Sequence, residues 1–409
     1  MAGLLDLPQD VVEIVFKYLV KIDDDLLEGL SSRSHTEGVT AARLRLVCRK
    51  WDDWFFVHHL HRTLTFTDGI HSLEFIRKLI RPGSRRPLCQ HLMIYDIWTA
   101  PSHCLPESAM ADQRARPAQG MMNSFESIEL LVAFFADTVV ELDLEFISCL
   151  WLPTRTIDLI GHIENLAVLR LALKSEWLSG CPSLPTLSGE DSDESGGCLG
   201  SLIRAARGLE RLDISQLPPQ CLPRHFPIPL QTTPTITQLD IKLVDEQPIE
   251  SLINLSRALK PSLKVLSIQS FRDDGLRLVP IFETLREYLE GLFISHESAL
   301  THILQMEFPK LRVFRIHYWD GCLADLLTQD LFAMAHIRLI AIYSHTVYRR
   351  KNLYTDPFAR LPRLEKFVFL HARLGDSPPL SYIKHCRAHR LQCIFLNHGE
   401  IPEIMMQKN

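Results

Sequence analysis

The sequence predicts an α/β protein in two parts: a short N-terminal group of helices, then a long irregular solenoid of parallel strands with outer helices. Two observations support this prediction. The opening residues have the apolar spacing of amphipathic helices. From about residue 60 onward, the pattern apolar-x-x-apolar-x-apolar recurs at a nearly constant interval. A constant interval predicts stacked units, because one such unit cannot cover its own apolar strand face.

The composition narrows the class of protein. The chain has 409 residues, of which 46% are hydrophobic and 23% are charged, with a net charge of -5. This balance argues against global disorder and gives no general electrostatic reason to bind nucleic acid. The sequence has no signal-peptide pattern and no membrane-spanning run of about 18 apolar residues. The ten cysteines are scattered without a C-x-x-C pair, so we expect a reducing compartment, cytoplasmic or nuclear.

The first helix is predicted just after the N-terminus. Pro8 suits the first turn of a helix, where its missing N–H would lack a partner in any case. Val11, Val12, Val15 and Leu19 then form one apolar stripe at helical spacing.

A second helical segment covers residues 44–51, where Leu44, Val47 and Trp51 repeat at i+3 and i+7 with basic residues between them. Two or three helices in about 50 residues cannot bury this much apolar surface against one another. The surplus predicts docking on another surface.

These two segments together resemble the F-box, which reads as Leu-Pro, an apolar helix, a polar break and a Leu-x-x-Val-Cys-Arg-x-Trp segment. The resemblance covers about residues 4–56 and implies a domain at 1–58 that binds a Skp-type adaptor. Residues 21–40 make a longer and more polar break than is usual, which leaves the path between the helices open. The alternative is a plain helical cap on the following domain. The residues that the resemblance places at the adaptor are Leu7, Pro8, Val11, Ile14, Val15, Leu19, Leu44, Val47, Cys48 and Trp51.

The recurring strand pattern defines the second part. Its middle apolar positions are 64, 92, 142, 169, 212, 239, 266, 292, 314, 340, 367 and 394, and nine of the eleven intervals lie between 22 and 28 residues. The two long intervals contain polar stretches at about 99–123 and 175–200, which we predict to be inserted loops. Amphipathic segments between the strands, such as 124–138, predict helices.

This pattern resembles leucine-rich repeats over about residues 60–398. The resemblance implies a repeat domain at 59–398 and a C-terminal tail at 399–409. The regular Asn or Cys of strict repeats is missing, so we expect an irregular solenoid. The alternative is an ordinary α/β domain with Leu-rich strands.

Catalytic and metal-binding motifs are absent from the sequence, which has no phosphate-binding glycine loop, nucleophile elbow or H-E-x-x-H. We therefore expect no catalytic residues, no metal and no cofactor. His58-His59-Leu60-His61 is interpreted as the end of the N-terminal helices. Cys386, His389 and Cys393 are interpreted as packing residues rather than ligands.

Alternation along the strands predicts the residues of a concave surface, opposite the helices. In the early repeats these are charged: Glu141, Asp143, Glu145, Arg170, Arg211, Asp213 and Asp240. In the late repeats they are Phe293, Arg315, His317, Tyr343 and Phe395. Aromatic residues and Arg dominate binding hot spots, so the late set is the predicted substrate-binding surface. The alternative is that these aromatic residues pack under loops.

Resemblance to F-box proteins with leucine-rich repeats implies a substrate-recognition subunit of an SCF-type (Skp–cullin–F-box) ubiquitin ligase. Such a subunit binds the Skp-type adaptor, and through it the cullin and RING subunits, and holds a protein substrate on its repeats. It is not itself an enzyme, and no nucleic acid or membrane partner is implied. One alternative is a non-ligase F-box scaffold or localisation protein. Another is an enzyme with an unrecognised site on the repeats.

Overall fold

The structure is a computed structural model, and it describes residues 7–26, 33–80, 86–98, 124–147, 150–174, 193–218, 222, 235–243, 249–270, 275–318, 323–343, 356–372, 380–396 and 401. The chain forms two compact units. The first contains Met1–Gly189 and Ser201–Gly208, and the second contains Glu190–Gly200 and Leu209–Asn409. The predicted boundaries at 58 and 398 follow sequence pattern rather than contacts, and they stay a prediction.

The first unit begins with three helices, α1 (Gln9–Leu26), α2 (Arg33–Leu44) and α3 (Arg49–His58). The Pro8 carbonyl accepts hydrogen bonds from the backbone amides of Val11 and Val12 in the first turn of α1. The core of the three helices is an aromatic and aliphatic cluster of Val12, Phe16, Val20, Ala41, Trp51 and Phe55. Most of the predicted polar break at 21–40 is helical, because α1 continues to Leu26 and α2 starts at Arg33.

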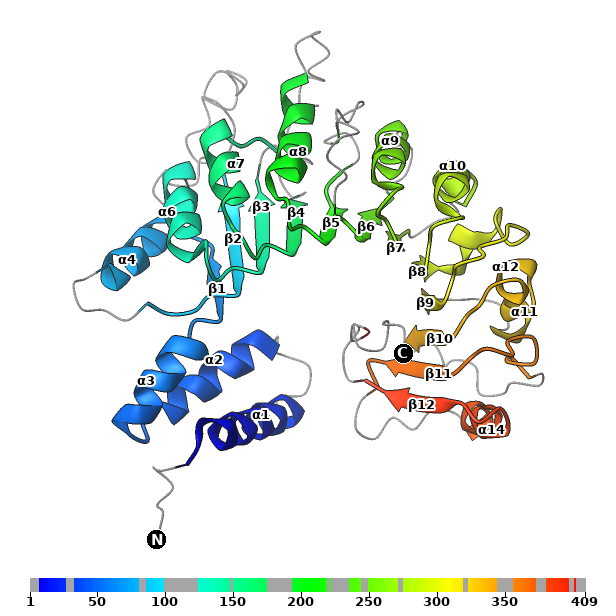
Figure 1. Cartoon of the computed structure of the whole chain (residues 1–409), viewed down its shortest axis with the longest axis horizontal. Helices are drawn as coiled ribbons and strands as arrows, with labels where there is room; N and C mark the ends of the chain where they lie inside the picture. The colour runs from blue at the N-terminus through cyan, green and yellow to red at the C-terminus, as the bar shows by residue number, and fades with distance from the viewer. Residues whose placement is uncertain are drawn as a thin grey trace, which may run out of the picture. The chain divides into compact units, whose positions relative to one another are not determined.

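Four parallel strands follow in the first unit, namely β1 (Thr63–Phe66), β2 (His91–Ile97), β3 (Glu141–Phe146) and β4 (Val168–Leu173), hydrogen-bonded in that order. The helices α4 (Gly69–Leu79), α6 (Phe125–Phe135) and α7 (Thr154–Gly161) cover one face of these strands (Figure 1). Asp68 and Ser124 cap α4 and α6 with their side chains. The predicted middle positions pair directly across the strands, from Leu64 through Leu92 and Leu142 to Leu169.

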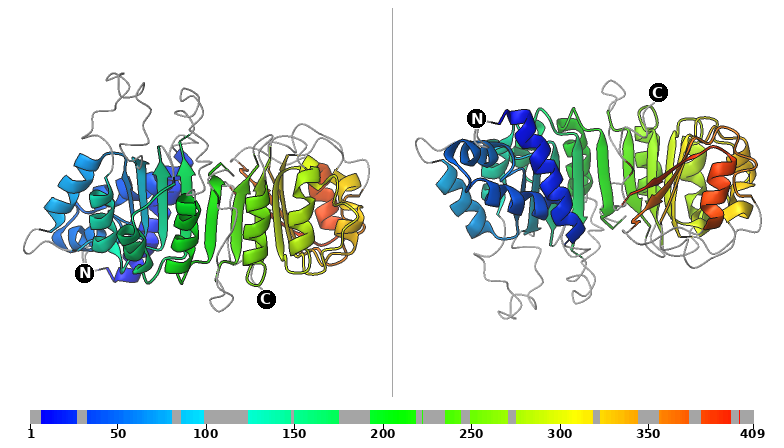
Figure 2. Two further views of the ribbon diagram at one scale, coloured as in Figure 1. Left: turned by 90° about the horizontal axis from the view of Figure 1, so that it is seen from above. Right: turned by 90° about the horizontal axis from the view of Figure 1, so that it is seen from below.

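The second unit continues the same plan (Figure 2). Its strands are β5 (Arg211–Gln216), β6 (Gln238–Lys242), β7 (Val265–Gln269), β8 (Gly291–His296), β9 (Val313–Tyr318), β10 (Leu339–Tyr343), β11 (Lys366–Leu370) and β12 (Gln392–Phe395), each parallel to the next. Its described helices are α9 (Glu250–Leu259), α10 (Gly275–Leu285), the 3-10 helix η5 (Glu297–Leu300), α11 (Leu323–Leu327), α12 (Asp330–Ala333) and α14 (Leu380–Ala388). Middle positions from Leu212 to Phe367 again lie in register. The predicted α/β class, with successive parallel strands and helices between them, is confirmed.

Two predictions need correction. Helix α8 (Asp193–Ala205) occupies the end of the loop predicted at 175–200, so any insertion there is shorter than expected. In the last repeat, Phe367 pairs with Cys393 and not with Ile394, so the predicted middle position is shifted by one residue. The predicted loop at 99–123 and nearly all of the predicted tail at 399–409 lie outside the described residues.

Candidate functional site

The first candidate surface lies on the three helices. On the side of α1 that faces away from the helical core, Ile14 is 54% exposed, and Val11 and Tyr18 are exposed as well. The turn between α2 and α3 adds Leu46, which is 83% exposed, and Val47. We call these five residues the helical apolar surface. Several large apolar side chains that stay exposed on one small helical unit indicate a contact surface.

Helix α1 carries this surface because its apolar residues extend around more than one face. With 3.6 residues in each turn, Val12, Phe16 and Val20 fall on one side and pack into the core. Ile14 and Tyr18 fall on the neighbouring side and stay in water. The predicted stripe combined residues from both sides, and its members Val15 and Leu19 lie half-buried between them.

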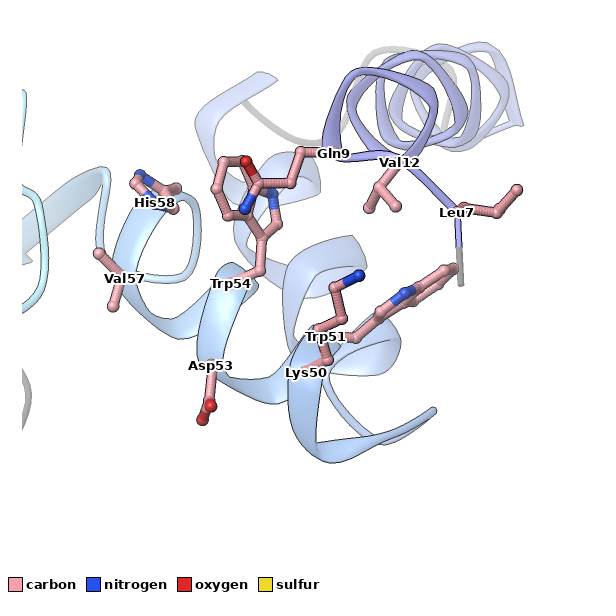
Figure 3. A pocket seen from close by; sticks show the side chains of 9 residues that line it. All are labelled: Leu7, Gln9, Val12, Lys50, Trp51, Asp53, Trp54, Val57 and His58. Atoms are coloured by element: carbon pink, nitrogen blue, oxygen red, sulfur yellow. The ribbon is translucent and has the colours of Figure 1, made fainter. Parts of the chain in front are cut away.

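A pocket of about 300 Å³ lies between the start of α1 and the outer side of α3 (Figure 3). Val12 and Trp51 give it an apolar floor, while polar side chains such as Lys50 and Asp53 line its edge. Burial lowers the pKa of His58, another lining residue, and the neighbouring His59 lowers it further. An apolar floor with a polar rim suits the insertion of one apolar side chain from a partner.

The ten residues predicted at the adaptor fall into three groups. Pro8, Val11, Ile14 and Val47 are exposed, and Leu7, Val15, Leu19, Leu44 and Cys48 are half-buried. Trp51 is only 4% exposed and belongs to the helical core, so it holds α3 against α1 and reaches the surface only as the floor of the pocket. The sequence interpretation missed Tyr18 and Leu46. Tyr18 lies four residues after Ile14, so helical spacing places the two on one face.

A part-buried hydrogen-bond network connects α1 to α3 and to the residue that follows α3. Oε1 of Glu13 accepts hydrogen bonds from Trp54 Nε1 at 3.2 Å and contacts His59 Nε2 at 2.6 Å. The His59 ring also packs on Phe16, with 4.3 Å between the ring centroids. This network holds the pocket and the helical apolar surface on a rigid support.

The second candidate surface is the sheet face opposite the helices. In the first unit, Glu141 on β3 contacts His91 at 3.1 Å and Arg170 at 2.7 Å, from the strands on either side. Burial alone would raise the pKa of Glu141, but the hydrogen bonds and positive charges of His91 and Arg170 outweigh burial and lower the pKa to about 2. In the second unit, Arg211 and Asp240 pair in the same way at 2.9 Å. Glu141, Arg170, Arg211 and Asp240 are therefore paired across neighbouring strands.

Within the second unit, the sheet face opposite the helices changes character from β7 onward. Val265, Phe293, Val313, Leu339, Ala341, Val368, Leu370 and Ile401 form one buried apolar cluster on this face. Phe293 is only 4% exposed, so it is a packing residue and not an open contact. Ile401 lies in the region predicted to be a tail, yet it belongs to this cluster. Gly291 keeps the cluster tight, because a Cβ there would come within 3.2 Å of a Val265 methyl group.

Three rings line the concave face where β9, β10 and β11 end. His317 stacks on Tyr343 with 3.9 Å between centroids, and Tyr343 lies 5.1 Å from His371. The Arg315 guanidinium lies 4.5 Å from the centre of the Phe293 ring. His371 has a φ of 51°, which is uncommon for a residue other than glycine and is often found at functional sites. We call Arg315, His317, Tyr343 and His371 the concave aromatic row.

Phe395 does not belong to this row, and its predicted placement is wrong. It pairs with Phe369, and the two rings are stacked at 5.2 Å on the helix-covered face. Ile394 and Leu396 pack against the concave cluster instead. A strand that is shifted by one residue turns every side chain to the other face, which accounts for this error.

The histidine run after α3 serves packing. His61 lies between the Phe56 and Phe75 rings, and burial together with the positive charge of Arg45 lowers its pKa to about 4. Within the residues that the structure describes, no group of three or more His, Cys, Asp or Glu side chains is placed to hold a metal ion. None of the described helices is both long enough and apolar enough to cross a bilayer.

Comparison with known proteins adds no assignment. No protein-family model matches this sequence, and no curated protein matches it. The residues and geometry described above therefore carry the functional argument.

Proposed function

We propose that this chain is a substrate-receptor subunit of an SCF-type ubiquitin ligase. In this role the three N-terminal helices bind a Skp-type adaptor, and through it the cullin and RING subunits. The repeats bind a protein substrate. The chain contributes proximity, because tethering raises the effective concentration of substrate lysines at the thioester of a separate ubiquitin-carrying enzyme.

The observation that carries the proposal is the helical apolar surface. It lies on the segments that resemble an F-box, and it stays exposed although α1 already fills the helical core from its other side. When a partner covers the exposed Ile14 and Leu46 side chains, the complex is stabilised by about 25 cal/mol for each Å² of apolar surface removed from water. The neighbouring pocket offers an anchoring position for the same partner.

Calorimetric titration of the purified full chain with a Skp-type adaptor tests the first half of the proposal. Ile14→Asp and Leu46→Asp each place a charge within the proposed apolar contact. We expect each variant to bind the adaptor about tenfold more weakly or worse, which corresponds to about 1.4 kcal/mol.

Leu380→Asp is the matched control, because Leu380 at the start of α14 is 81% exposed, nearly as much as Leu46. The control should bind the adaptor like the original chain. Equal affinity for the original chain, Ile14→Asp and Leu46→Asp would contradict the proposed surface. Absence of binding by the well-folded original chain would contradict the function.

The substrate half of the proposal rests on the concave aromatic row. Arg315, His317 and Tyr343 are half-buried, so their rings and guanidinium are partly accessible, whereas Phe293 lies beneath them. Arg315→Ala combined with His317→Ala should abolish ubiquitylation of a captured partner by the reconstituted ligase while adaptor binding is retained. Glu145→Gln, on the concave face of β3, is the control.

The same assay separates a ligase receptor from a scaffold. A receptor passes ubiquitin to the captured partner, and a scaffold holds the partner without modification. Capture without ubiquitylation in the presence of adaptor, cullin and RING subunits would favour the scaffold.

A further inference from the structure

Two cysteines meet at the end of the repeats. Cys386 lies in the last turn of α14, and Cys393 is the second residue of β12. The chain reverses between them through Arg390, whose φ is 56°, and the Leu391 amide donates a hydrogen bond of 2.8 Å to the Cys386 carbonyl. Cys393 is in register with Phe367, whose ring stacks on Tyr382 of α14, so its side chain faces α14 and the turn places it beside Cys386.

The two thiols have unequal environments. Cys386 is only 1% exposed. A hydrogen bond between the two thiols, together with burial, raises the pKa of Cys386. The same hydrogen bond stabilises a thiolate on Cys393 and lowers the pKa of that residue. Cys393 is also the more accessible of the two. The pair therefore combines an accessible nucleophile with a buried second thiol, an arrangement found in peroxide-sensitive dithiols.

We propose that Cys386 and Cys393 form a reversible intramolecular disulfide when the protein meets hydrogen peroxide. The Cys393 thiolate attacks one peroxide oxygen, the O–O bond breaks, and the other oxygen leaves as hydroxide, which takes up a proton to become water. The Cys386 sulfur then attacks the Cys393 sulfenic acid, an S–S bond forms, and a second water leaves. The two thiols lose two electrons and two protons, and the peroxide is reduced to two waters.

Two of the other described cysteines, Cys89 and Cys48, provide an internal comparison. Burial raises the pKa of Cys89 to about 12, which makes it a poor nucleophile. Cys48 is half-buried in the turn before α3 and is not part of the Cys386–Cys393 hydrogen bond. If accessibility alone decided the reaction, peroxide would oxidise Cys48 as readily as Cys393. The hydrogen bond with Cys386 predicts instead that peroxide oxidises Cys393 selectively.

The disulfide would act on the final strand. β12 pairs with β11 alone among the described strands, so it is an edge strand. A covalent bond from β12 to α14 closes only a short loop, so its effect should be local rather than global. We expect slower amide exchange in β12 and α14 after oxidation, with β7 and β8 unchanged.

Peptide mapping of the native full chain tests the proposal. The reduced protein is treated with hydrogen peroxide, blocked with a maleimide and digested. We expect a cross-linked peptide joining Cys386 to Cys393, an intact mass lower by two hydrogens, and full reversal by dithiothreitol. Further oxidation of Cys393 without a cross-link would overturn the proposal, as would a disulfide between any other pair.

Three variants sharpen the test. Cys386→Ser should leave Cys393 as a sulfenic acid that dimedone traps, and Cys393→Ser should leave Cys386 unoxidised. Cys89→Ser is the matched control and should form the cross-link like the original chain. Because Cys386→Ser alters a buried site, the original chain is also oxidised in urea, where the preference for Cys393 over Cys48 should disappear. A preference that persists in urea would show that the folded contact is not its cause.

Discussion

Helix α1 and strand β10 both carry large apolar side chains on two faces, but only in β10 are both faces buried. In α1, Phe16 is buried while Ile14 is exposed; in β10, Leu339 and Ile340 point to opposite faces of the sheet and both are buried. The concave side of β10 is covered within its own unit, in part by Ile401. Surplus apolar residues in a sequence therefore indicate either a docking surface or a second core, and the exposure of each side chain distinguishes the two.

The largest expected effect contrasts the two sides of α1. Phe16→Ala should lower the free energy of unfolding of the helical part by about 3–5 kcal/mol, because it leaves a cavity beside Phe55 and His59. Ile14→Ala should change the same quantity by less than about 0.5 kcal/mol, because more than half of the side chain is already exposed to water. Urea unfolding followed by tryptophan fluorescence measures both, with Trp98, Trp151, Trp177 and Trp319 replaced by Phe so that Trp51 and Trp54 report on the helical part. A large loss for Ile14→Ala would mean that this side of α1 supports the fold.

The next prediction applies the same contrast to β10. Leu339→Ala on the concave face and Ile340→Ala on the helix-covered face should each cost about 2–5 kcal/mol, because both side chains are fully buried. Chemical denaturation followed by near-ultraviolet circular dichroism compares the two variants. If Leu339→Ala costs less than about 1 kcal/mol, the concave cluster behaves as an open surface and not as a second core.

Acid titration tests the charged part of the sheet face opposite the helices, which lies in the first unit. The Glu141 carboxylate has a pKa lowered to about 2, from 4.5, so its stabilising effect is present above pH 4.5 and is lost as the pH falls toward 2. After allowance for its partial exposure, we expect about 1–2 kcal/mol from this group. Glu141→Gln should lower stability at pH 7 and flatten the decline between pH 4.5 and 2.

The control for this titration is Glu283→Gln, which alters an exposed side chain on α10. It should keep the pH dependence of the original chain. An unchanged acid profile in Glu141→Gln would show that His91 and Arg170 do not hold the carboxylate as their distances indicate.

Sequence periodicity predicted most of the fold because the apolar middle positions obey one physical rule. Leu142, Leu169, Leu266 and Phe314 must all face the helices, so their spacing predicts the register of the strands. The rule failed at β12, where Cys393, Ile394, Phe395 and Leu396 are all apolar. Such a run suits either face, and only the pairing with β11 decides between them.

The candidate sites were less predictable from sequence. Helical spacing correctly placed Ile14 and Val47 in segments that carry exposed apolar residues. It could not predict that Trp51 fills the helical core, because burial depends on how three helices pack together. Alternation placed Phe293 on the concave face correctly. It could not indicate that Phe293 is covered, because the covering residues include Ile401, which is distant in sequence and carries no repeat signal.

The smallest expected effect compares helix packing in the N-terminal helices with packing among the repeats. A Cβ added at Gly38 in α2 meets no atom within 4 Å, so Gly38→Ala should raise the free energy of unfolding by about 0.5–1 kcal/mol through better helix propensity. At Gly161, the last residue of α7, an added Cβ would lie 2.9 Å from the Ala205 Cβ, so Gly161→Ala should be destabilising. Thermal unfolding of the two variants measures effects of opposite sign. A gain at both positions would mean that α7 and α8 can separate without cost, and that helix packing in the repeats is as loose as it is around α2.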